Sequence, residues 1–376
     1  MLTNLELKHN KSSNNPDNGR GESKEGDLFM KKRLVAGMLT ALMAMSMVAC
    51  GSSAAPAEAP ADAAPAADAA APAAEAPAAE AGGELIKVAI INNDPNESGY
   101  RTANDRDLQA TFTEANGYEA TFYYSLKNDE QIQYAQQAIN DEVDYLLLSA
   151  ADTSGWDSTL KSAADAGITV LLFDRTIDAD ESLYAASVVS DMAAEGKTAV
   201  DWLASQNLDE YNVIHIQGVV GSAAQIGRSG ALDEKVAAES NWNIVVQQTG
   251  NWSAEEAQQI VQSQIDAGKK FNVIYAENDN MADGAQKALE AAGISYGVGG
   301  DVIIMGFDCN KFALQNLLDQ KWNYDGQCNP FQSSYLVDII NTLEAGGTLA
   351  QKTIIMDEKG FDATTITADD VEKYGI

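Results

Sequence analysis

The sequence predicts an α/β protein in which parallel sheets are covered by helices on both faces. Short runs of apolar, largely β-branched residues recur along the chain, and most are followed by a longer segment with helical periodicity. Hydrophobicity within each run is continuous rather than alternating, which indicates strands that are buried on both faces. Seven or more such strands in about 290 residues exceed what one hydrophobic core holds comfortably, so we expect two lobes.

The elements can be placed by residue range. Predicted strands lie at residues 86–91, 145–148, 169–173, 213–216, 244–246, 273–275 and 302–305. Predicted helices lie at residues 131–139, 156–166, 193–204, 254–267 and 281–292. Gly167 and Gly293 each follow a predicted helix, where a residue with positive φ commonly ends one. We expect the chain to leave the first lobe near residues 187–192.

The first 84 residues are not expected to belong to either lobe. Residues 1–29 are polar and lack a hydrophobic period, so we interpret them as a non-native start or a disordered leader, with Met30 as the true start. Basic residues at 31–33 and an apolar run at 34–48 follow, which is typical of an export signal over residues 30–49. That run of about 15 residues is shorter than the roughly 20 that a helix needs to cross a bilayer.

The predicted signal ends at a cysteine between small residues. Ala49-Cys50-Gly51 resembles the lipobox of bacterial lipoproteins, which implies that Cys50 is acylated and anchors the chain to a membrane. A simple cleaved signal or an uncleaved anchor helix is the alternative. Residues 50–84 would then form a tether, because Ala, Pro, Glu and Asp dominate this segment and supply no large apolar side chain to offset the entropy cost of ordering.

Charge and cysteine content exclude several classes of function. Acidic residues outnumber basic ones 56 to 24, and no segment after the predicted signal has the clustered lysines and arginines that neutralise phosphates, so nucleic acid is not an expected partner. After Cys50 the chain has only Cys309 and Cys328, without a Cys/His cluster, so we expect no metal site. Their spacing does not tell whether these two cysteines form a disulfide.

Polar side chains gather where the predicted strands end, which is the edge of a parallel sheet at which ligands bind. Such groups follow four predicted strands: residues 92–101, Asp174 with Arg175, Asn278 to Asn280, and Asp308. Any one cluster alone is explained as well by a helix cap or a turn. Arg101, Arg175 and Arg228, however, are not needed as caps. Guanidinium and carboxylate groups together suit the vicinal hydroxyls of a sugar.

Aromatic side chains add to this prediction, because sugars present apolar C–H faces that pack on rings. The candidates are Tyr100, Trp156 and Trp252. Trp252 follows a predicted strand at its carboxyl end, where it could contact a ligand. Trp156 begins a predicted helix, where packing explains it as well as ligand contact.

Residues for catalysis are missing from the sequence. His215 is the only histidine after Cys50, and it lies within an apolar strand, where a structural role is the better explanation. The sequence has neither a nucleophile elbow nor a P-loop, and Gly218 to Ser222 is only a weak phosphate-loop pattern. We therefore expect a binding protein, not an enzyme, and no cofactor.

A set of motifs in fixed order carries a family resemblance between Leu85 and about Asp357. The motifs are Glu97-Ser98-Gly99-Tyr100-Arg101, Ser154-Gly155-Trp156, Asp174 to Asp178, Gln217 to Ser222, Arg228, Asn278-Asp279 with Met281, Gly306 to Asp308, and Asn329-Pro330. With them the chain resembles the sugar-binding proteins of ABC importers that have the ribose-binding, type I periplasmic fold. Within that family it is most similar to the galactofuranose-binding branch.

The resemblance implies a sugar-binding site, and the matching motif positions identify its residues. They are Glu97, Ser98, Tyr100, Arg101, Asp174, Arg175, Arg228, Trp252, Asn278, Asp308 and Asn329. The galactofuranose-binding branch usually has Trp where this chain has Tyr100, and Phe where it has Trp252. These exchanges keep the stacking rings and leave the sugar open.

The resemblance also implies lobes, partners and location. One lobe would comprise residues 85–188 and 329–355, and the other residues 189–328 and 356–376. A monomer on the outer face of the cell membrane, or in the periplasm, would close around a monosaccharide and deliver it to an ABC permease. A receptor that feeds signalling or chemotaxis with a furanosyl signal such as autoinducer-2 is the alternative. A lac-repressor-type regulator would need a DNA-binding headpiece where this chain has a signal and tether.

Overall fold

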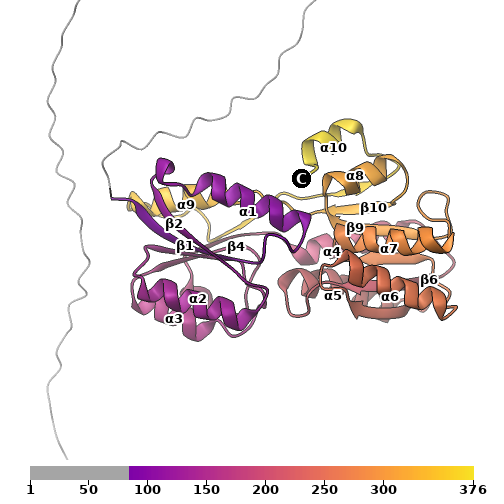
Figure 1. Cartoon of the computed structure of the whole chain (residues 1–376), viewed down its shortest axis with the longest axis horizontal. Helices are drawn as coiled ribbons and strands as arrows, with labels where there is room; N and C mark the ends of the chain where they lie inside the picture. The colour runs from indigo at the N-terminus through magenta and orange to yellow at the C-terminus, as the bar shows by residue number, and fades with distance from the viewer. Residues whose placement is uncertain (1–83) are drawn as a thin grey trace, which may run out of the picture. The chain divides into compact units, whose positions relative to one another are not determined.

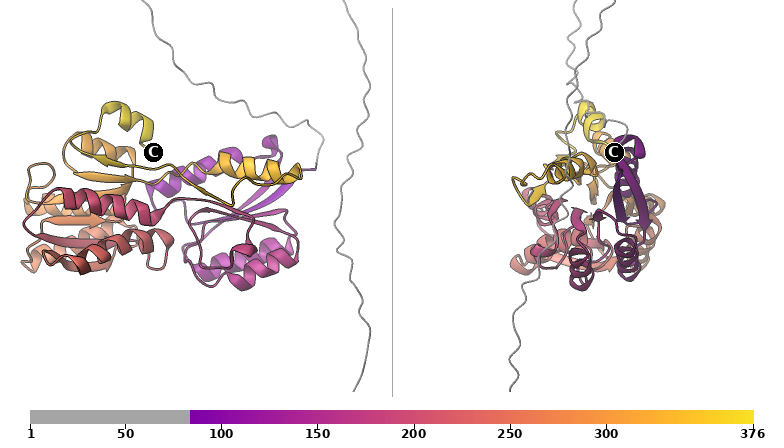
Figure 2. Two further views of the ribbon diagram at one scale, coloured as in Figure 1. Left: turned by 180° about the vertical axis from the view of Figure 1, so that it is seen from behind. Right: turned by 90° about the vertical axis from the view of Figure 1, so that its left-hand side faces the viewer.

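The computed structural model describes residues 84–376, so the predicted leader, signal, Cys50 anchor and most of the tether lie outside the described residues. Within this range the strands form two six-stranded sheets, each with helices packed against both faces (Figure 1, Figure 2). We call each sheet with its helices a lobe. This arrangement confirms the α/β fold class predicted from the sequence. In residues 84–376, no helix combines the length and the apolar character needed to cross a membrane.

The first lobe has a wholly parallel sheet in the order β11-β5-β4-β3-β1-β2. Its strands are β1 (Ile86–Asn92), β2 (Tyr118–Tyr124), β3 (Tyr145–Leu148), β4 (Thr169–Asp174), β5 (Ala186–Val189) and β11 (Thr353–Ile355). Helices α1 (Gly99–Thr111) and α9 (Ser333–Glu344) cover one face. Helices α2 (Asn128–Asn140) and α3 (Asp157–Asp165) cover the other. Each face therefore has its own apolar core.

The second lobe repeats this plan in the order β12-β10-β9-β8-β6-β7, with β12 antiparallel to β10. Its strands are β6 (Tyr211–Gln217), β7 (Trp242–Thr249), β8 (Val273–Ala276), β9 (Ile303–Asp308), β10 (Tyr324–Gln327) and β12 (Gly360–Asp362). Helices α4 (Met192–Ser205) and α5 (Ala223–Ala238) cover one face. Helices α6 (Ala254–Asp266), α7 (Asp279–Ala292) and α8 (Lys311–Leu318) cover the other, and α10 (Ala368–Tyr374) packs beside α8.

All seven predicted strands are present, with bounds that differ by a few residues. The structure adds β2, which is mostly half-buried, and the short strands β5, β10, β11 and β12. Among the helices it adds α1, whose buried face carries Arg101, Asn104 and Asp105 as well as apolar side chains such as Leu108. Continuous hydrophobicity thus found the central strands and missed elements whose buried face is short or polar.

The chain passes between the two sheets three times. It leaves the first sheet after β5, returns to it after β10, and leaves it again after β11 to form β12. The three crossing segments therefore all lie between the lobes. The lobe boundaries assigned from the resemblance, at residues 188, 328 and 355, stay a prediction.

The packing of α6 against α7 depends on Gly284. A Cβ atom at this position would lie 2.0 Å from the carbonyl oxygen of Ala254, so the backbones must move apart to accept one. We expect Gly284→Ala to lower the free energy of unfolding by about 1 to 3 kcal/mol, as overpacking does. Urea denaturation of the purified protein measures this change.

Gly230→Ala is the matched control, because Gly230 also lies within a helix but a Cβ there meets no atom within 4 Å. Removal of a helical glycine should stabilise the protein by about 0.5 to 1 kcal/mol. Equal effects of the two substitutions would contradict the packing argument.

Candidate functional site

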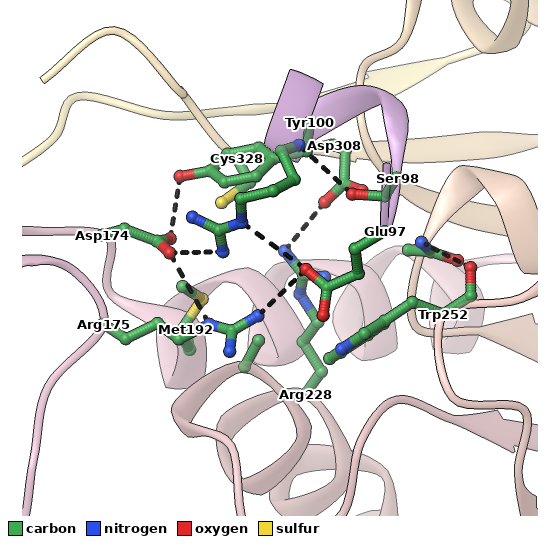
Figure 3. Close-up of a pocket in the computed structure, with 13 residues that line it drawn as sticks. Glu97, Ser98, Tyr100, Asp174, Arg175, Met192, Arg228, Trp252, Asp308 and Cys328 are labelled. Atoms are coloured by element: carbon green, nitrogen blue, oxygen red, sulfur yellow. Dashed lines mark hydrogen bonds and ion pairs between the residues drawn. The ribbon is translucent and has the colours of Figure 1, made fainter. Parts of the chain in front are cut away.

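A polar cavity lies where loops of both lobes meet, at the carboxyl ends of strands β1, β4, β8 and β9. The empty space among its lining residues is about 300 Å³, which includes space open to solvent. The residues that line it are Glu97, Ser98, Tyr100, Arg101, Asp174, Arg175, Met192, Ala224, Arg228, Trp252, Asn278, Asp308 and Cys328 (Figure 3). The structure thus brings together around one cavity ten of the eleven residues that the resemblance implied.

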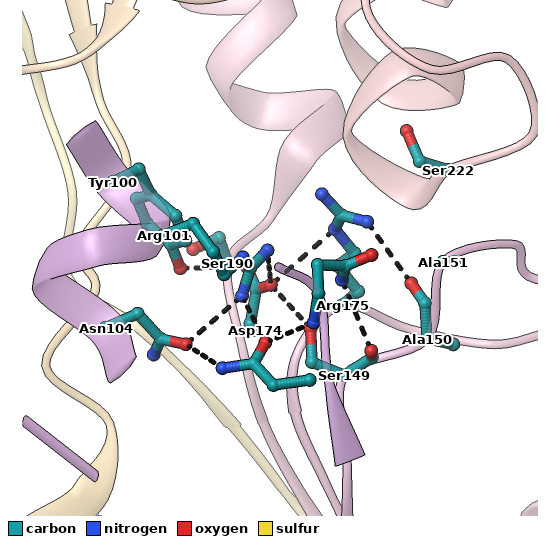
Figure 4. A network of polar contacts seen from close by, with 12 residues as sticks. Tyr100, Arg101, Asn104, Ser149, Ala150, Ala151, Asp174, Arg175, Ser190 and Ser222 are labelled. Atoms are coloured by element: carbon teal, nitrogen blue, oxygen red, sulfur yellow. Dashed lines mark hydrogen bonds and ion pairs between the residues drawn. The ribbon is translucent and has the colours of Figure 1, made fainter. Parts of the chain in front are cut away.

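Asp174 is the centre of the first lobe's side of the cavity. It ends β4 with a positive φ of 63°, which turns its carboxylate away from the strand. That carboxylate accepts hydrogen bonds from Arg101 Nη2 at 2.7 Å, from the Tyr100 hydroxyl at 2.8 Å and from Ser149 Oγ at 2.7 Å (Figure 4). Burial alone would raise the pKa of Asp174, but the guanidinium groups of Arg101 and Arg175 outweigh burial and hold that pKa below its usual value.

Arg101 and Glu97 reach the cavity from the start of α1. The Ser98 hydroxyl caps this helix by accepting a hydrogen bond from the Arg101 backbone N–H at 3.2 Å, which fixes where the helix begins. Arg101 is 1% exposed and also donates to the Asn92 side chain at 2.8 Å. Glu97 pairs with Arg101 at 3.5 Å and with Arg175 at 3.9 Å. These pairings keep the arginine side chains in fixed positions within a buried site.

Arg228 is the matching centre of the second lobe's side. It comes from α5, although this helix was not predicted, and its guanidinium lies 2.8 Å from Glu195 and 3.3 Å from Asp308. It also donates to the carbonyl oxygen of Glu277. Burial raises the pKa of Asp308 well above its usual value. Arg228 opposes this shift, but the neighbouring carboxyl groups of Asp279 and Glu195 add to it.

Trp252 forms an apolar wall of the cavity. It has a positive φ of 63°, and its ring lies so close to Gly218 that a Cβ there would be 1.8 Å from a ring carbon. Only glycine at position 218 allows this approach. The ring Nε1 is buried and has no hydrogen-bond partner among the described residues, so it is free to donate to a bound molecule.

Residues at the rim of the cavity form hydrogen bonds from one lobe to the other. The Gly99 backbone N–H donates to Asn280 Oδ1 at 3.3 Å, and the Thr153 N–H donates to the Gly221 carbonyl oxygen at 3.1 Å. The lining is therefore shielded from water. A shielded site with paired charges, a free indole N–H and an apolar wall can bind a neutral molecule rich in hydroxyl groups, because each hydroxyl both donates and accepts.

Several residues singled out in the sequence lie elsewhere. Asn329 does not line the cavity, although it directly follows Cys328, which does. Trp156 is fully buried in the first lobe, and its Nε1 donates to the Asp152 carbonyl oxygen at 3.0 Å. Of the two explanations considered for Trp156, the structure therefore favours packing. His215 is also fully buried, 2.8 Å from Glu277, in line with the structural role expected for it.

Sequence reasoning missed three residues of the cavity and the residue that holds one of its arginines. Met192, Ala224 and Cys328 line the cavity, and no polar motif marked them. Glu195 lies in an alanine-rich helix with nothing in the sequence to pair it with Arg228. Cys328 and Cys309 are both buried and unpaired, which answers the question that their spacing left open.

Comparison with known proteins agrees with this fold and this cavity. The family model described as periplasmic binding protein domain matches residues 88–346. A fructose import binding protein of Bifidobacterium longum is 33% identical over 72% of this chain and 82% of its own length. The galactofuranose-binding protein of Escherichia coli is 30% identical over 60% of this chain and 72% of its own.

Two solved structures are similar over most of their length. The binding component of an arabinose ABC transporter from Shewanella sp. ANA-3, bound to L-arabinofuranose, has a TM-score of 0.70 and 26% identity, and the match covers 76% of this chain and 95% of that one. A galactofuranose-binding protein has a TM-score of 0.70 and 27% identity, with 76% and 98% covered. The match to the family model spans most of the residues that form the two lobes, and this chain therefore belongs to the periplasmic binding protein family.

Proposed function

We propose that this chain is an extracytoplasmic, lipid-anchored binding protein that encloses a monosaccharide between its lobes and delivers it to an ABC permease. Galactofuranose or a sugar of similar ring form is the proposed ligand. The observation that carries this proposal is the set of fixed arginine and carboxylate groups beside the Trp252 ring in one shielded cavity. Such a lining offers hydrogen bonds to hydroxyl groups and an apolar surface to the C–H face of a sugar.

The relatives narrow the choice of ligand without deciding it. Their names and titles include fructose, galactofuranose, ribose, L-arabinofuranose and β-D-fucofuranose. Several of these are sugars in the five-membered ring form. Family membership supports binding outside the cytoplasm, and the predicted signal and Cys50 support attachment of the chain to a membrane.

Titration calorimetry against individual sugars tests the proposed ligand. We expect heat of binding with fructose, galactose or arabinose, all of which form furanose rings, and weaker binding with myo-inositol, which has no furanose form. Ligand that binds only the folded protein should also raise its melting temperature. Absence of binding to every sugar, together with binding of a nucleoside or of autoinducer-2, would keep the fold and overturn the proposed ligand class.

Arg175→Ala and Asp308→Ala should each abolish sugar binding at accessible concentrations. Each removes a buried guanidinium or carboxyl group that we expect to bond a hydroxyl group, and loss of one partner of such a buried hydrogen-bonded pair typically costs about 2 to 5 kcal/mol of binding free energy. Calorimetry with the best sugar measures the effect, and cooperative thermal unfolding shows that the variants fold. Arg106→Ala is the control, because Arg106 lies exposed on α1. Unchanged affinity in both cavity variants would contradict the assignment of the site.

Cys50→Ser should release the chain from the membrane in a bacterial host that processes lipoproteins. The substitution removes the thiol that acylation requires and leaves the lobes unchanged. Fractionation followed by immunoblotting measures the distribution between membrane and soluble fractions. A Cys50→Ser chain that stays entirely in the membrane fraction would favour the uncleaved anchor helix over the lipid anchor.

A further inference from the structure

The three segments that cross between the lobes meet in one cluster of polar side chains. Ser190 directly follows β5, Cys328 and Asn329 directly follow β10, and Glu358 lies between β11 and β12. With Glu195 on α4, these residues form what we call the hinge cluster. Each of the three crossings contributes at least one member.

Glu358 connects all three crossings through one oxygen of its carboxyl group. Its Oε1 accepts a hydrogen bond from Ser190 Oγ at 2.7 Å and another from the Asn329 backbone N–H at 2.6 Å. Ser190 Oγ also lies 3.5 Å from Cys328 Sγ. A change in the relative positions of the crossings would break at least one of these contacts, so the contacts favour one arrangement of the lobes.

The hinge cluster continues into the sugar cavity. The Cys328 Sγ and one carboxyl oxygen each of Glu195 and Glu358 lie within 4.8 Å of one another. Glu195 also holds Arg228 at 2.8 Å, and both Arg228 and Cys328 line the cavity. The side chains that face a bound sugar are thus in contact with the side chains that fix the crossings.

A second cavity opens on the other side of the cluster. Its empty space is about 560 Å³, part of it open to solvent. It is lined by residues of the crossings and of α4, including Asp191, Glu195, Tyr324, Asp357, Glu358 and Lys359. The charged or titratable groups that face Glu358 are Glu195 from α4, Arg228 from α5 and Cys328 after β10. Burial, and next the neighbouring Glu195, raise the pKa of Glu358 to about 9. At neutral pH the carboxyl group is therefore uncharged, which avoids repulsion from Glu195.

We propose that Glu358 is a positioning residue that holds the three crossings in the closed arrangement of the lobes and thereby sets the affinity for sugar. The apparent affinity of a binding protein is reduced by the fraction of molecules that are not in the binding-competent state. Contacts that favour closure in the free protein therefore tighten binding without touching the ligand. The part of this inference that concerns affinity rests on the proposed function.

Glu358→Ala tests the proposal because it removes both hydrogen bonds of Oε1, whereas Glu358→Gln keeps a carbonyl oxygen that can accept them. We expect E358A to weaken sugar binding at least tenfold and E358Q to stay within about threefold of the wild type, since tenfold corresponds to one lost interaction of ordinary strength. E119A is the control, because Glu119 is an exposed glutamate on β2.

Lobe closure is measured separately, by electron–electron resonance between spin labels on the exposed residues of variants K161C and K269C, one in each lobe. Without ligand, E358A should shift the distance distribution toward longer distances and E119A should not. If wild-type protein binds no sugar but E358A still shifts the distribution, the proposed ligand fails and the hinge role stands. If E358A leaves the distances unchanged, the hinge role is overturned.

The pH dependence gives a readout that simple loss of packing would not. Raising the pH through about 9 should ionise Glu358 in the wild type, so the melting temperature should fall from neutral to alkaline pH by more than in E358Q, which cannot ionise there. All other titrating groups are common to the two proteins, so the difference reports the ionisation of Glu358 together with its effect on the pKa of the neighbouring Cys328. Identical profiles would overturn the role of the uncharged carboxyl group.

Discussion

The ion pair between Arg101 and Asp174 holds the first lobe's side of the cavity together. Both side chains are almost wholly buried, and a buried charge is tolerated only where it is paired and hydrogen-bonded. Loss of either partner would leave the other unpaired in a site shielded from water. Tyr100, Ser149 and Arg175 all take their positions from the same carboxylate, so the geometry of this side depends on one pair that joins the start of α1 to the end of β4.

The second side depends on a less balanced arrangement. Arg228 is a single positive charge between the carboxylates of Glu195 and Asp308, and it cannot fully compensate both. Hydroxyl groups of a ligand could donate to Asp308 and relieve part of this deficit. The two sides of the cavity therefore differ: the Asp174 carboxylate is fully paired within the protein, whereas the buried Nε of Arg175 and the carboxyl group of Asp308 are left to gain from a ligand.

The sequence was most informative where one physical rule dominated. Strands buried on both faces have continuous hydrophobicity, which made β1, β3 and β8 easy to predict. Helix α1 escaped prediction because polar residues such as Arg101 and Asn104 share its buried face with Leu108 and interrupt the apolar period. Arg228 could be predicted because arginines are few in this acidic chain and this one is not needed as a helix cap. Cys328 and Met192 could not, because only the fold brings these distant segments to the cavity.

The burial of Cys328 makes the reactivity of its thiol depend on folding. Burial raises the pKa of this thiol well above its usual value, and the same holds for Cys309, so neither forms much reactive thiolate in the folded protein. Outside the cytoplasm, where thiols are prone to oxidation, the two cysteines are protected by position instead of by a disulfide. That protection exists only after folding, so both thiols are open to oxidants until the second lobe has folded.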